Sequence, residues 1–163
     1  MNRRKIFTVS AVAALGVAFV SGSVFAQQKS LKEQIVGTWS ITAVADQYDD
    51  GKKEITFGTG VKGVFNFDGG GRFTQLIIGE KQAAMKNDDP RRPDAFTVAI
   101  IGTYAVDGNV IKVHTDRAAN SVRDGADLTY TVTGSGDTLT LAGSPRVDQK
   151  GTFKPTIEVA RAK

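Results

Sequence analysis

The chain has 163 residues, of which 21 are basic and 17 are acidic, and it contains no cysteine. The lack of cysteine excludes disulfides, thiolate metal sites and cysteine nucleophiles. The length is that of one domain that is large enough to bury a hydrophobic core without such cross-links.

Residues 1–26 have the features of a secretory signal peptide. Arg3, Arg4 and Lys5 precede an uncharged, mostly apolar run at 6–20, and the small residue Ala26 stands before the expected cleavage point. The apolar run is shorter than the roughly 20 residues that a membrane span needs. We therefore expect cleavage after Ala26, no stable membrane insertion of the remaining chain, and a periplasmic or secreted location.

Cleavage would change the charge of the protein. It removes three basic residues from the total of 21, which leaves 18 against 17 acidic residues, all of which follow Ala26. The domain at 27–163 is therefore close to neutral, and most of the formal charge of +4 belongs to the signal peptide. A surplus this small gives no reason to expect nucleic acid as a partner. We expect a monomeric domain.

The domain begins with a short helical segment at 31–36. Ser30 is placed as its N-cap, and Glu33 stands where it would complete a capping box. Gly37 ends the segment, and from there the apolar residues recur with a period of two, which indicates a strand. One face of this strand carries Trp39, Ile41, Ala43 and Ala45.

Eight more strands are predicted after the first one. Gly-rich and Asp-rich stretches at 68–71, 107–109 and 134–137 separate several of them and are typical of hairpin turns. No later window has a long helical period, so the sequence predicts an all-β antiparallel domain. The predicted strands lie at 53–57, 63–68, 72–78, 98–107, 110–115, 128–133, 138–142 and 156–161.

Several motifs resemble a known family. The Gly37-x-Trp39 start of the first strand and Arg161 near the end of the last resemble the lipocalin pattern. The segments LKEQIVGTW, FGTGVKGVFNFDGGGRF and IIGTYAVDGNVIKVH are similar to the bacterial lipocalin-like domain family of small exported proteins. This resemblance covers most of residues 31–142. It implies an up-and-down barrel of 8–10 strands, closed at one end by Gly37, Trp39 and Arg161, with Arg161 packed over Trp39.

The number of predicted strands raises a question of topology. Nine strands would leave Arg161 at the opposite end from Trp39 in a simple up-and-down barrel. We therefore expect the segment 79–96 to cross from one end of the barrel to the other. This crossing places the connections 58–62, 107–109 and 134–137 at the Trp39 end. The other end would be an open mouth formed by the connections 46–52, 69–71, 116–126 and 143–154.

The interior and the mouth supply the candidate binding residues. Small residues on inward faces, such as Ala43 and Gly102, would leave room for a cavity. Arg117, Arg123 and Arg146 fall in the mouth connections, where they either form a cationic rim for an acidic ligand or solvate ordinary loops. The expected cavity residues are Ile41, Ala43, Phe65, Phe67, Phe73, Ile77, Tyr104, Tyr130 and Leu141.

Catalytic and metal-binding groups are sparse. The register of the predicted hairpin around 107–109 places His114, the only histidine, on the outer face. One histidine without cysteine gives no basis for a metal site, and we expect no cofactor. We expect binding of a small hydrophobic or amphiphilic molecule without chemistry. Two alternatives stay open, namely a cavity-based isomerase or cyclase that uses Tyr104, Tyr130 or His114, and a solid barrel that binds a protein partner.

Overall fold

The structure of the chain is a computed structural model that describes residues 30–80 and 97–163. The predicted signal peptide lies outside the described residues. Two short helical elements and ten strands are present in the described ranges. In chain order they are α1 (Leu31–Ile35), β1 (Gly37–Tyr48), β2 (Lys53–Ile55), β3 (Lys62–Phe67), β4 (Arg72–Ile78), β5 (Thr97–Asp107), β6 (Val110–Ala118), η1 (Ser121–Arg123), β7 (Asp127–Ser135), β8 (Thr138–Gly143), β9 (Arg146–Asp148) and β10 (Gly151–Arg161).

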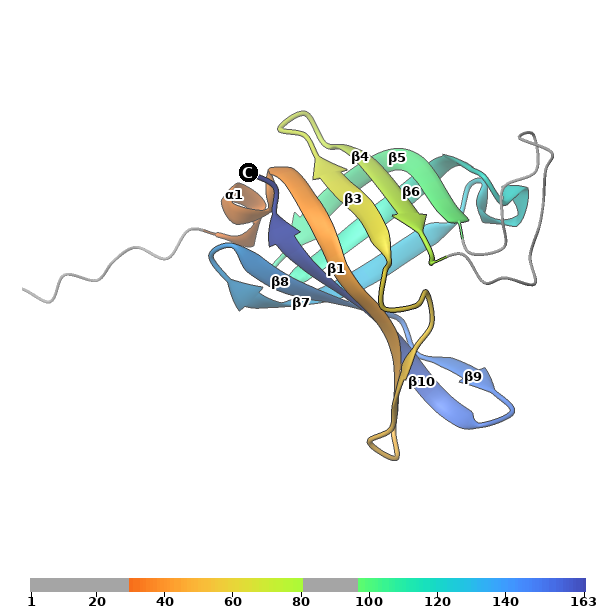
Figure 1. Ribbon diagram of the computed structural model, residues 1–163. Helices are drawn as coiled ribbons and strands as arrows, with labels where there is room; N and C mark the ends of the chain where they lie inside the picture. Colours follow the sequence, from red (N-terminus) through yellow and green to blue (C-terminus); the bar gives the residue numbers. More distant parts are fainter. Residues whose placement is uncertain (1–29, 81–96) are drawn as a thin grey trace, which may run out of the picture.

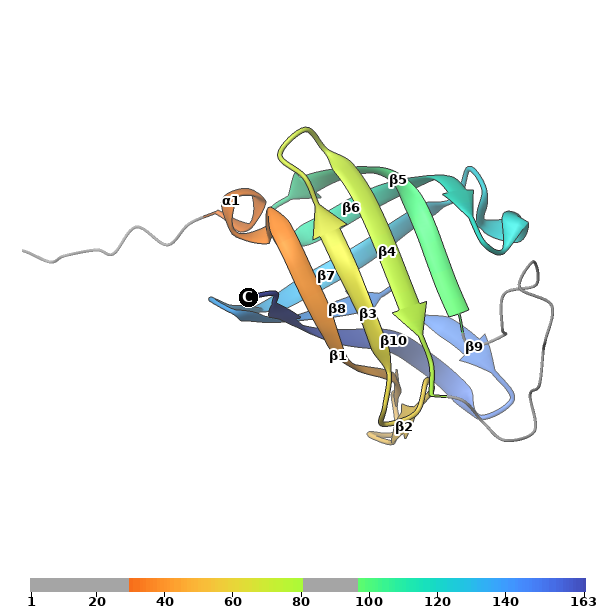
Figure 2. The ribbon, with the colours of Figure 1, turned by 45° about the horizontal axis from the view of Figure 1, so that its top comes forward.

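Eight of the strands form a closed antiparallel barrel (Figures 1 and 2). Their order is β1-β3-β4-β5-β6-β7-β8-β10, and β10 pairs with β1 to close the sheet. Closure leaves these eight strands without the free edges that an open sheet exposes. The prediction of an all-β antiparallel barrel is confirmed. Within the described residues, no helix is long and apolar enough to cross a membrane.

The two remaining strands extend β1 and β10 beyond the barrel. The first part of β1 pairs with β3 and its later part with β2, while β10 pairs with β9 at its start and with β8 afterwards. The order β2-β1-β10-β9 makes a small four-stranded sheet, here called the flange, which projects from the barrel in Figure 1. Strand β2 therefore continues the line of β3 along β1, and β9 continues the line of β8 along β10.

This arrangement corrects the predicted topology. Ile78 pairs directly with Thr97, so both borders of segment 79–96 lie at the same end of the barrel, and the predicted crossing is wrong. The predicted number of strands is odd because β2 and β3, which both run antiparallel to β1, together take the place of one neighbouring strand. Arg161 still pairs with Trp39, as expected.

Two connections also change ends. Gly37 pairs with Phe67, which places the tri-glycine turn at 69–71 at the Trp39 end. Lys62 pairs with Ile78, which places the connection at 58–62 at the opposite end. The closed end therefore carries the tight turns after β3, β5 and β7. The open end carries the flange and the longer connections.

Helix α1 covers the closed end of the barrel. Ser30 and Glu33 form the expected capping box. The Trp39 side chain is fully buried, and its Nε1–H donates a hydrogen bond to the carbonyl oxygen of Ile35 at 2.7 Å. The helix thus satisfies the one polar atom of the indole, which would be costly to bury without a partner.

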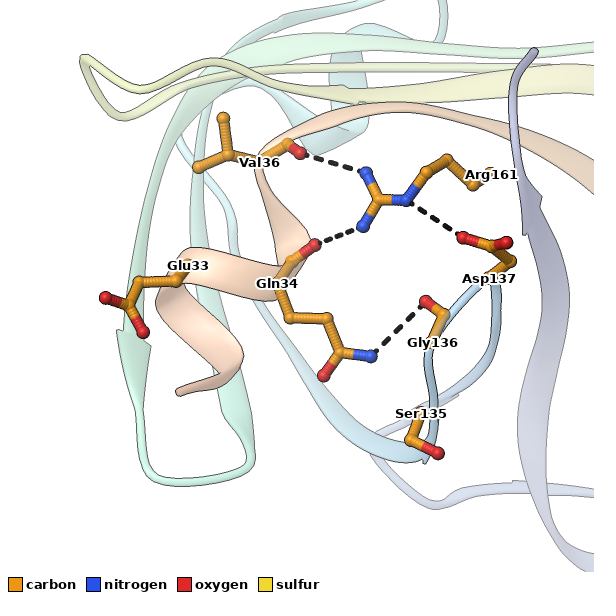
Figure 3. Close-up of a pocket in the computed structure, with 7 residues that line it drawn as sticks. All are labelled: Glu33, Gln34, Val36, Ser135, Gly136, Asp137 and Arg161. Atoms are coloured by element: carbon orange, nitrogen blue, oxygen red, sulfur yellow. Dashed lines mark hydrogen bonds and ion pairs between the residues drawn. The ribbon is translucent and has the colours of Figure 1, made fainter. Parts of the chain in front are cut away.

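Arg161 joins α1 to the turn between β7 and β8 (Figure 3). Its Cζ lies 4.3 Å from the ring centroid of Trp39, so the expected stacking is present. The guanidinium donates to the carbonyl oxygen of Gln34 at 2.7 Å and to that of Val36 at 3.3 Å. Its Nε lies 3.4 Å from Asp137. The pocket drawn in Figure 3, of about 500 Å³, is lined in part by Gln34, Asp137 and Arg161, which take part in this closure.

The half of the barrel next to Trp39 is filled by aromatic side chains. Phe67 lies at the centre, with ring centroids 5.3 Å from Phe73, 5.0 Å from Tyr104 and 5.9 Å from Phe65. The Tyr104 hydroxyl donates to the carbonyl oxygen of Asp68 at 2.7 Å. Close packing of these rings makes a solid core where the sequence predicted the walls of a cavity.

A bulge in β1 changes which residues face the interior. The register with β10 shifts between Ile41 and Ala43, so the inward face continues with Val44 and Asp46. Val44 belongs to the core, whereas Ala43 is on the outward side of the alternation. The expectation that Ala43 faces the cavity is therefore wrong, because one extra residue in a strand reverses every later side chain.

Candidate functional site

A pocket of about 470 Å³ lies inside the open end of the barrel. Strands β1, β4, β5, β7, β8, β9 and β10 contribute to it, together with the connections after β2, β6 and β8. The lining residues are Val44, Asp46, Thr56, Phe57, Gln75, Ile77, Val98, Arg123, Asp127, Leu128, Thr129, Tyr130, Gly143, Ser144, Pro145, Arg146, Phe153, Pro155 and Ile157.

Apolar side chains from opposite sides of the barrel make most of the pocket wall. On one side, the bulge in β1 brings Val44 inward, opposite Ile157 of β10. On the other side, Ile77 of β4 pairs with Val98 of β5, and Leu128 comes from β7. These residues can bury the apolar part of a ligand.

Tyr130 stands at the boundary between the packed core and the pocket. Its ring lies 6.1 Å from that of Phe65 in an edge-to-face arrangement, and its hydroxyl donates to Gln75 Oε1 at 3.2 Å. Burial raises the pKa of Tyr130 to about 12. The phenol is therefore neutral at physiological pH, where it can form hydrogen bonds but is a poor general base.

Two arginines line the pocket from separate elements. Arg123 ends η1, whose first turn is held by Asn120 through a 3.2 Å hydrogen bond from the backbone N–H of Val122. Arg146 begins β9 and pairs with Phe153 of β10. Both cations act against the rise in the pKa of Tyr130. The pocket therefore combines an apolar wall with two cationic side chains.

Asp46 is the acidic group on the pocket face of β1. Burial raises the pKa of this carboxyl; Arg146 opposes the rise, whereas Asp148 and Glu54 add to it and Lys150 opposes it. Among residues 30–80 and 97–163, its carboxylate forms no hydrogen bond or ion pair. Ionised Asp46 is thus a partly desolvated charge without a direct partner in this part of the chain, which costs stability.

We expect Asp46→Asn to raise the melting temperature at pH 7. A carboxyl whose pKa is raised on folding stabilises the fold fully below its ordinary pKa of 3.8 and loses that contribution as the pH rises through the folded value. Asn cannot ionise, so the gain should be largest near neutrality and should shrink toward pH 3. Thermal unfolding followed by circular dichroism at both pH values measures it, with Asp49→Asn at the hairpin tip as control. A lower melting temperature at pH 7 would contradict the prediction.

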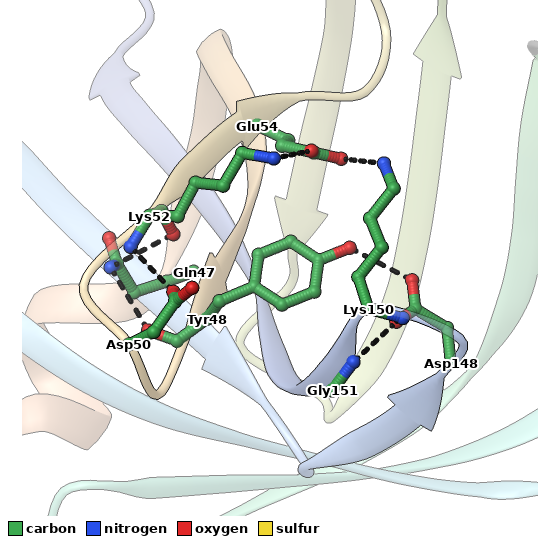
Figure 4. Close-up of polar contacts among 8 residues, drawn as sticks. All are labelled: Gln47, Tyr48, Asp50, Lys52, Glu54, Asp148, Lys150 and Gly151. Atoms are coloured by element: carbon green, nitrogen blue, oxygen red, sulfur yellow. Dashed lines mark hydrogen bonds and ion pairs between the residues drawn. The ribbon is translucent and has the colours of Figure 1, made fainter.

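A polar network fixes the flange that carries Asp46 and Arg146 (Figure 4). Tyr48 donates to Asp148 Oδ2 at 2.8 Å, which links the β1–β2 hairpin to the β9–β10 hairpin. Glu54 lies between Lys150 at 2.6 Å and Lys52 at 2.7 Å. Hydrogen bonds from these two ammonium groups lower the pKa of Glu54 to about 2, so it stays ionised at neutral pH.

The pocket contains only part of the residue set predicted from the sequence. Ile77 and Tyr130 line it, as do Arg123 and Arg146. Arg117 lies outside, where it pairs with Asp124 at 3.1 Å. Ala43 faces outward. The other expected cavity residues pack in the core, namely Ile41, Phe65, Phe67, Phe73, Tyr104 and Leu141.

Sequence reasoning missed several lining residues, among them Asp46, Gln75 and Phe153. Gln75 alternates with Phe73 and Ile77 on β4, so the period of two contained the signal for its inward position. Asp46 and Phe153 had no such signal, because the bulge in β1 and the start of β10 decide their direction. Both lie in the flange region, which the sequence indicated only as loops.

The candidate proton-transfer groups lie at three separate places. His114 is exposed on the outer face of β6, as predicted, and its Nδ1 lies 2.8 Å from Asp127. Tyr104 is at the closed end, where burial and the charge of Asp68 raise its pKa. Tyr130 alone among the three lines the pocket. The structure therefore does not bring these groups together into an acid–base pair.

Fold and site together define a closed antiparallel β-barrel with a pocket at its open end. Neither a family model nor a curated protein matches the sequence. A crystal structure of an uncharacterized protein from Bacteroides eggerthii DSM 20697 is similar at 14% sequence identity and a TM-score of 0.39. The similar region covers 76% of this chain and 98% of that chain.

Proposed function

We propose that this protein is an exported, lipocalin-like barrel that binds a small hydrophobic or amphiphilic molecule in the open-end pocket. The observation that carries the proposal is the pocket of about 470 Å³ with apolar walls inside a closed barrel. Sites for small molecules commonly have volumes of roughly 300–1,000 Å³. The stacking of Arg161 on Trp39 supports the lipocalin-like assignment. The pattern of residues 1–26 supports export to the periplasm or the medium.

The pocket favours apolar ligands for a simple energetic reason. Ile77, Val98 and Leu128 present hydrocarbon surface that a ligand would remove from water. Such burial is worth about 25 cal/mol per Å² of apolar surface. Polar groups at the rim would set the orientation of the ligand, with its apolar part toward these side chains.

Filling the pocket should weaken binding strongly. Leu128 is partly buried and lines the pocket, so Leu128→Trp would place an indole in the space for the ligand. We expect the variant to lose at least about tenfold in affinity for N-phenyl-1-naphthylamine, a neutral apolar dye whose fluorescence rises on burial, which corresponds to about 1.4 kcal/mol. Fluorescence titration measures the affinity, and circular dichroism verifies the fold.

Thr131→Trp is the matched control, because Thr131 lies on the exposed face of the same strand. This variant adds the same indole outside the barrel and should bind the dye as the parent does. Equal binding by the parent and the Leu128→Trp variant would place the dye elsewhere. Either that result or a parent protein that binds no apolar probe would refute the proposed function and favour the solid interaction module.

A further inference from the structure

The arginines of the described residues fall into two groups. Three have acidic partners: Arg72 lies 3.0 Å from Asp116, Arg117 lies 3.1 Å from Asp124, and Arg161 lies 3.4 Å from Asp137. The other two, Arg123 and Arg146, form no ion pair or side-chain hydrogen bond within residues 30–80 and 97–163. Both line the pocket. The guanidinium groups without a described acidic partner are therefore those that a bound ligand would meet.

The two guanidinium groups line the same pocket from separate elements. Arg123 ends η1 and Arg146 begins β9. An arginine can donate two parallel hydrogen bonds to a carboxylate, and charge-assisted bonds of this kind are stronger than neutral ones. Arg123 is half-buried and Arg146 is exposed, so water partly screens both charges. The site is suited to an anionic group at the end of an apolar molecule.

Acidic side chains at the pocket limit how much negative charge it can accept. Asp46 lines the same face as Arg146 and reduces the net positive charge there. Asp127 also borders the pocket, but its carboxylate lies against His114 on the outer surface. Glu54 and Asp148 belong to the flange network. This balance favours a single negative charge on the ligand over two.

We propose that the pocket takes a carboxylate-bearing amphiphile, with its carboxylate at Arg123 and Arg146 and its hydrocarbon part against Ile77 and Leu128. This assignment names the ligand class of the proposed function and rests on it. The Tyr130 hydroxyl, which donates to Gln75 Oε1, gives the site a polar group at its inner boundary.

The experiment compares ligands that differ only in their head group. Decanoate, 1-decanol and decylamine compete with N-phenyl-1-naphthylamine for the parent protein at pH 8, where decanoate is ionised. We expect decanoate to displace the dye at a concentration about tenfold lower than 1-decanol, and decylamine to be the weakest. High salt should weaken decanoate binding and leave 1-decanol unchanged, because salt screens the charges at the open end.

Single variants assign the preference to the two arginines. Arg123→Gln and Arg146→Gln should each lower the affinity for decanoate about five- to tenfold and leave that for 1-decanol unchanged. Asp46→Asn should raise the affinity for decanoate severalfold, because it removes a like charge from the pocket. Arg117→Gln is the matched control, because Arg117 lies on β6 outside the pocket. This variant should change neither affinity.

The outcomes separate the two proposals. If decanoate and 1-decanol displace the dye equally, or if both pocket variants keep the affinity for decanoate, the carboxylate assignment is wrong and the apolar binding function stands. If no apolar probe binds the parent protein, both proposals fail. A loss of decanoate binding in Arg117→Gln as large as in Arg123→Gln would also overturn the assignment, because it would reflect overall charge alone.

Discussion

Replacement of Gly102 by alanine should destabilise the barrel by about 3 kcal/mol or more. Gly102 lies on β5 opposite Thr115 of β6, next to a shift in register between Ile101 and Gly102. A Cβ atom at this position would overlap the backbone carbonyl oxygen of His114. A backbone atom within a paired strand cannot rotate away as a side chain can, so the two strands would have to separate. Chemical denaturation followed by circular dichroism measures the loss.

Gly69→Ala is the matched control for this prediction. Gly69 lies in the turn after β3, and a Cβ there would meet no atom within 4 Å. Its substitution should change the free energy of unfolding by less than about 0.5 kcal/mol. If Gly102→Ala has an equally small effect, then β5 and β6 can move apart at the bulge without cost. The glycine serves close approach of the strands, whereas the sequence suggested that it left room for a cavity.

The closed end could be predicted from the sequence because its signals are local. Ser30 and Glu33 define the helix start through neighbouring groups, and Gly37 marks its end. Trp39 opens a strand whose first residues alternate cleanly. The partner on the adjacent strand β10, Arg161, followed from the family resemblance, because no local pattern relates two residues so far apart in the chain.

The bulge and the flange could not be predicted in the same way. Beyond Ile41, both faces of β1 carry apolar residues, since Ala43 and Ala45 alternate with Val44. Hydrophobic alternation fixes a register only where one face is clearly apolar. Strand β9 has three exposed residues and no apolar face. Its sequence therefore shows no hydrophobic alternation that would predict its pairing with β10. The flange led to the incorrect crossing of segment 79–96, because β2 and β3 count as two strands in the sequence although both run antiparallel to β1.

The same features explain which part of the site was foreseen. Arg123 and Arg146 were expected near the mouth because both follow predicted strands that end there. The pocket wall, however, depends on which half of each strand faces the packed core. Phe65 and Ile77 both face inward, but only Ile77 is near the open end. Aromatic side chains at the closed end are large enough to fill the barrel, so the free volume remains where the interior residues are smaller.

Arg161→Ala should lower the free energy of unfolding by about 2 kcal/mol. A cation over a Trp face contributes about 0.5–2 kcal/mol. The substitution also removes the donors to the carbonyl oxygens of Gln34 and Val36. A net hydrogen bond is worth roughly 1 kcal/mol, and part of that is recovered from water at this half-exposed position. Thermal and chemical unfolding should show the loss, with the β-sheet signal of the folded protein unchanged.

Two further variants separate the causes. Arg161→Lys keeps the positive charge but lacks the planar guanidinium that stacks on Trp39 and donates to two carbonyls, so it should recover less than half of the loss. Arg72→Ala removes an exposed arginine paired with Asp116, and such surface pairs contribute about 0–1 kcal/mol. If Arg161→Ala is no more harmful than Arg72→Ala, burial of Trp39 beneath α1 is sufficient to close this end. In that case the Arg161 guanidinium covers Trp39 but contributes little to the stability of the closed end.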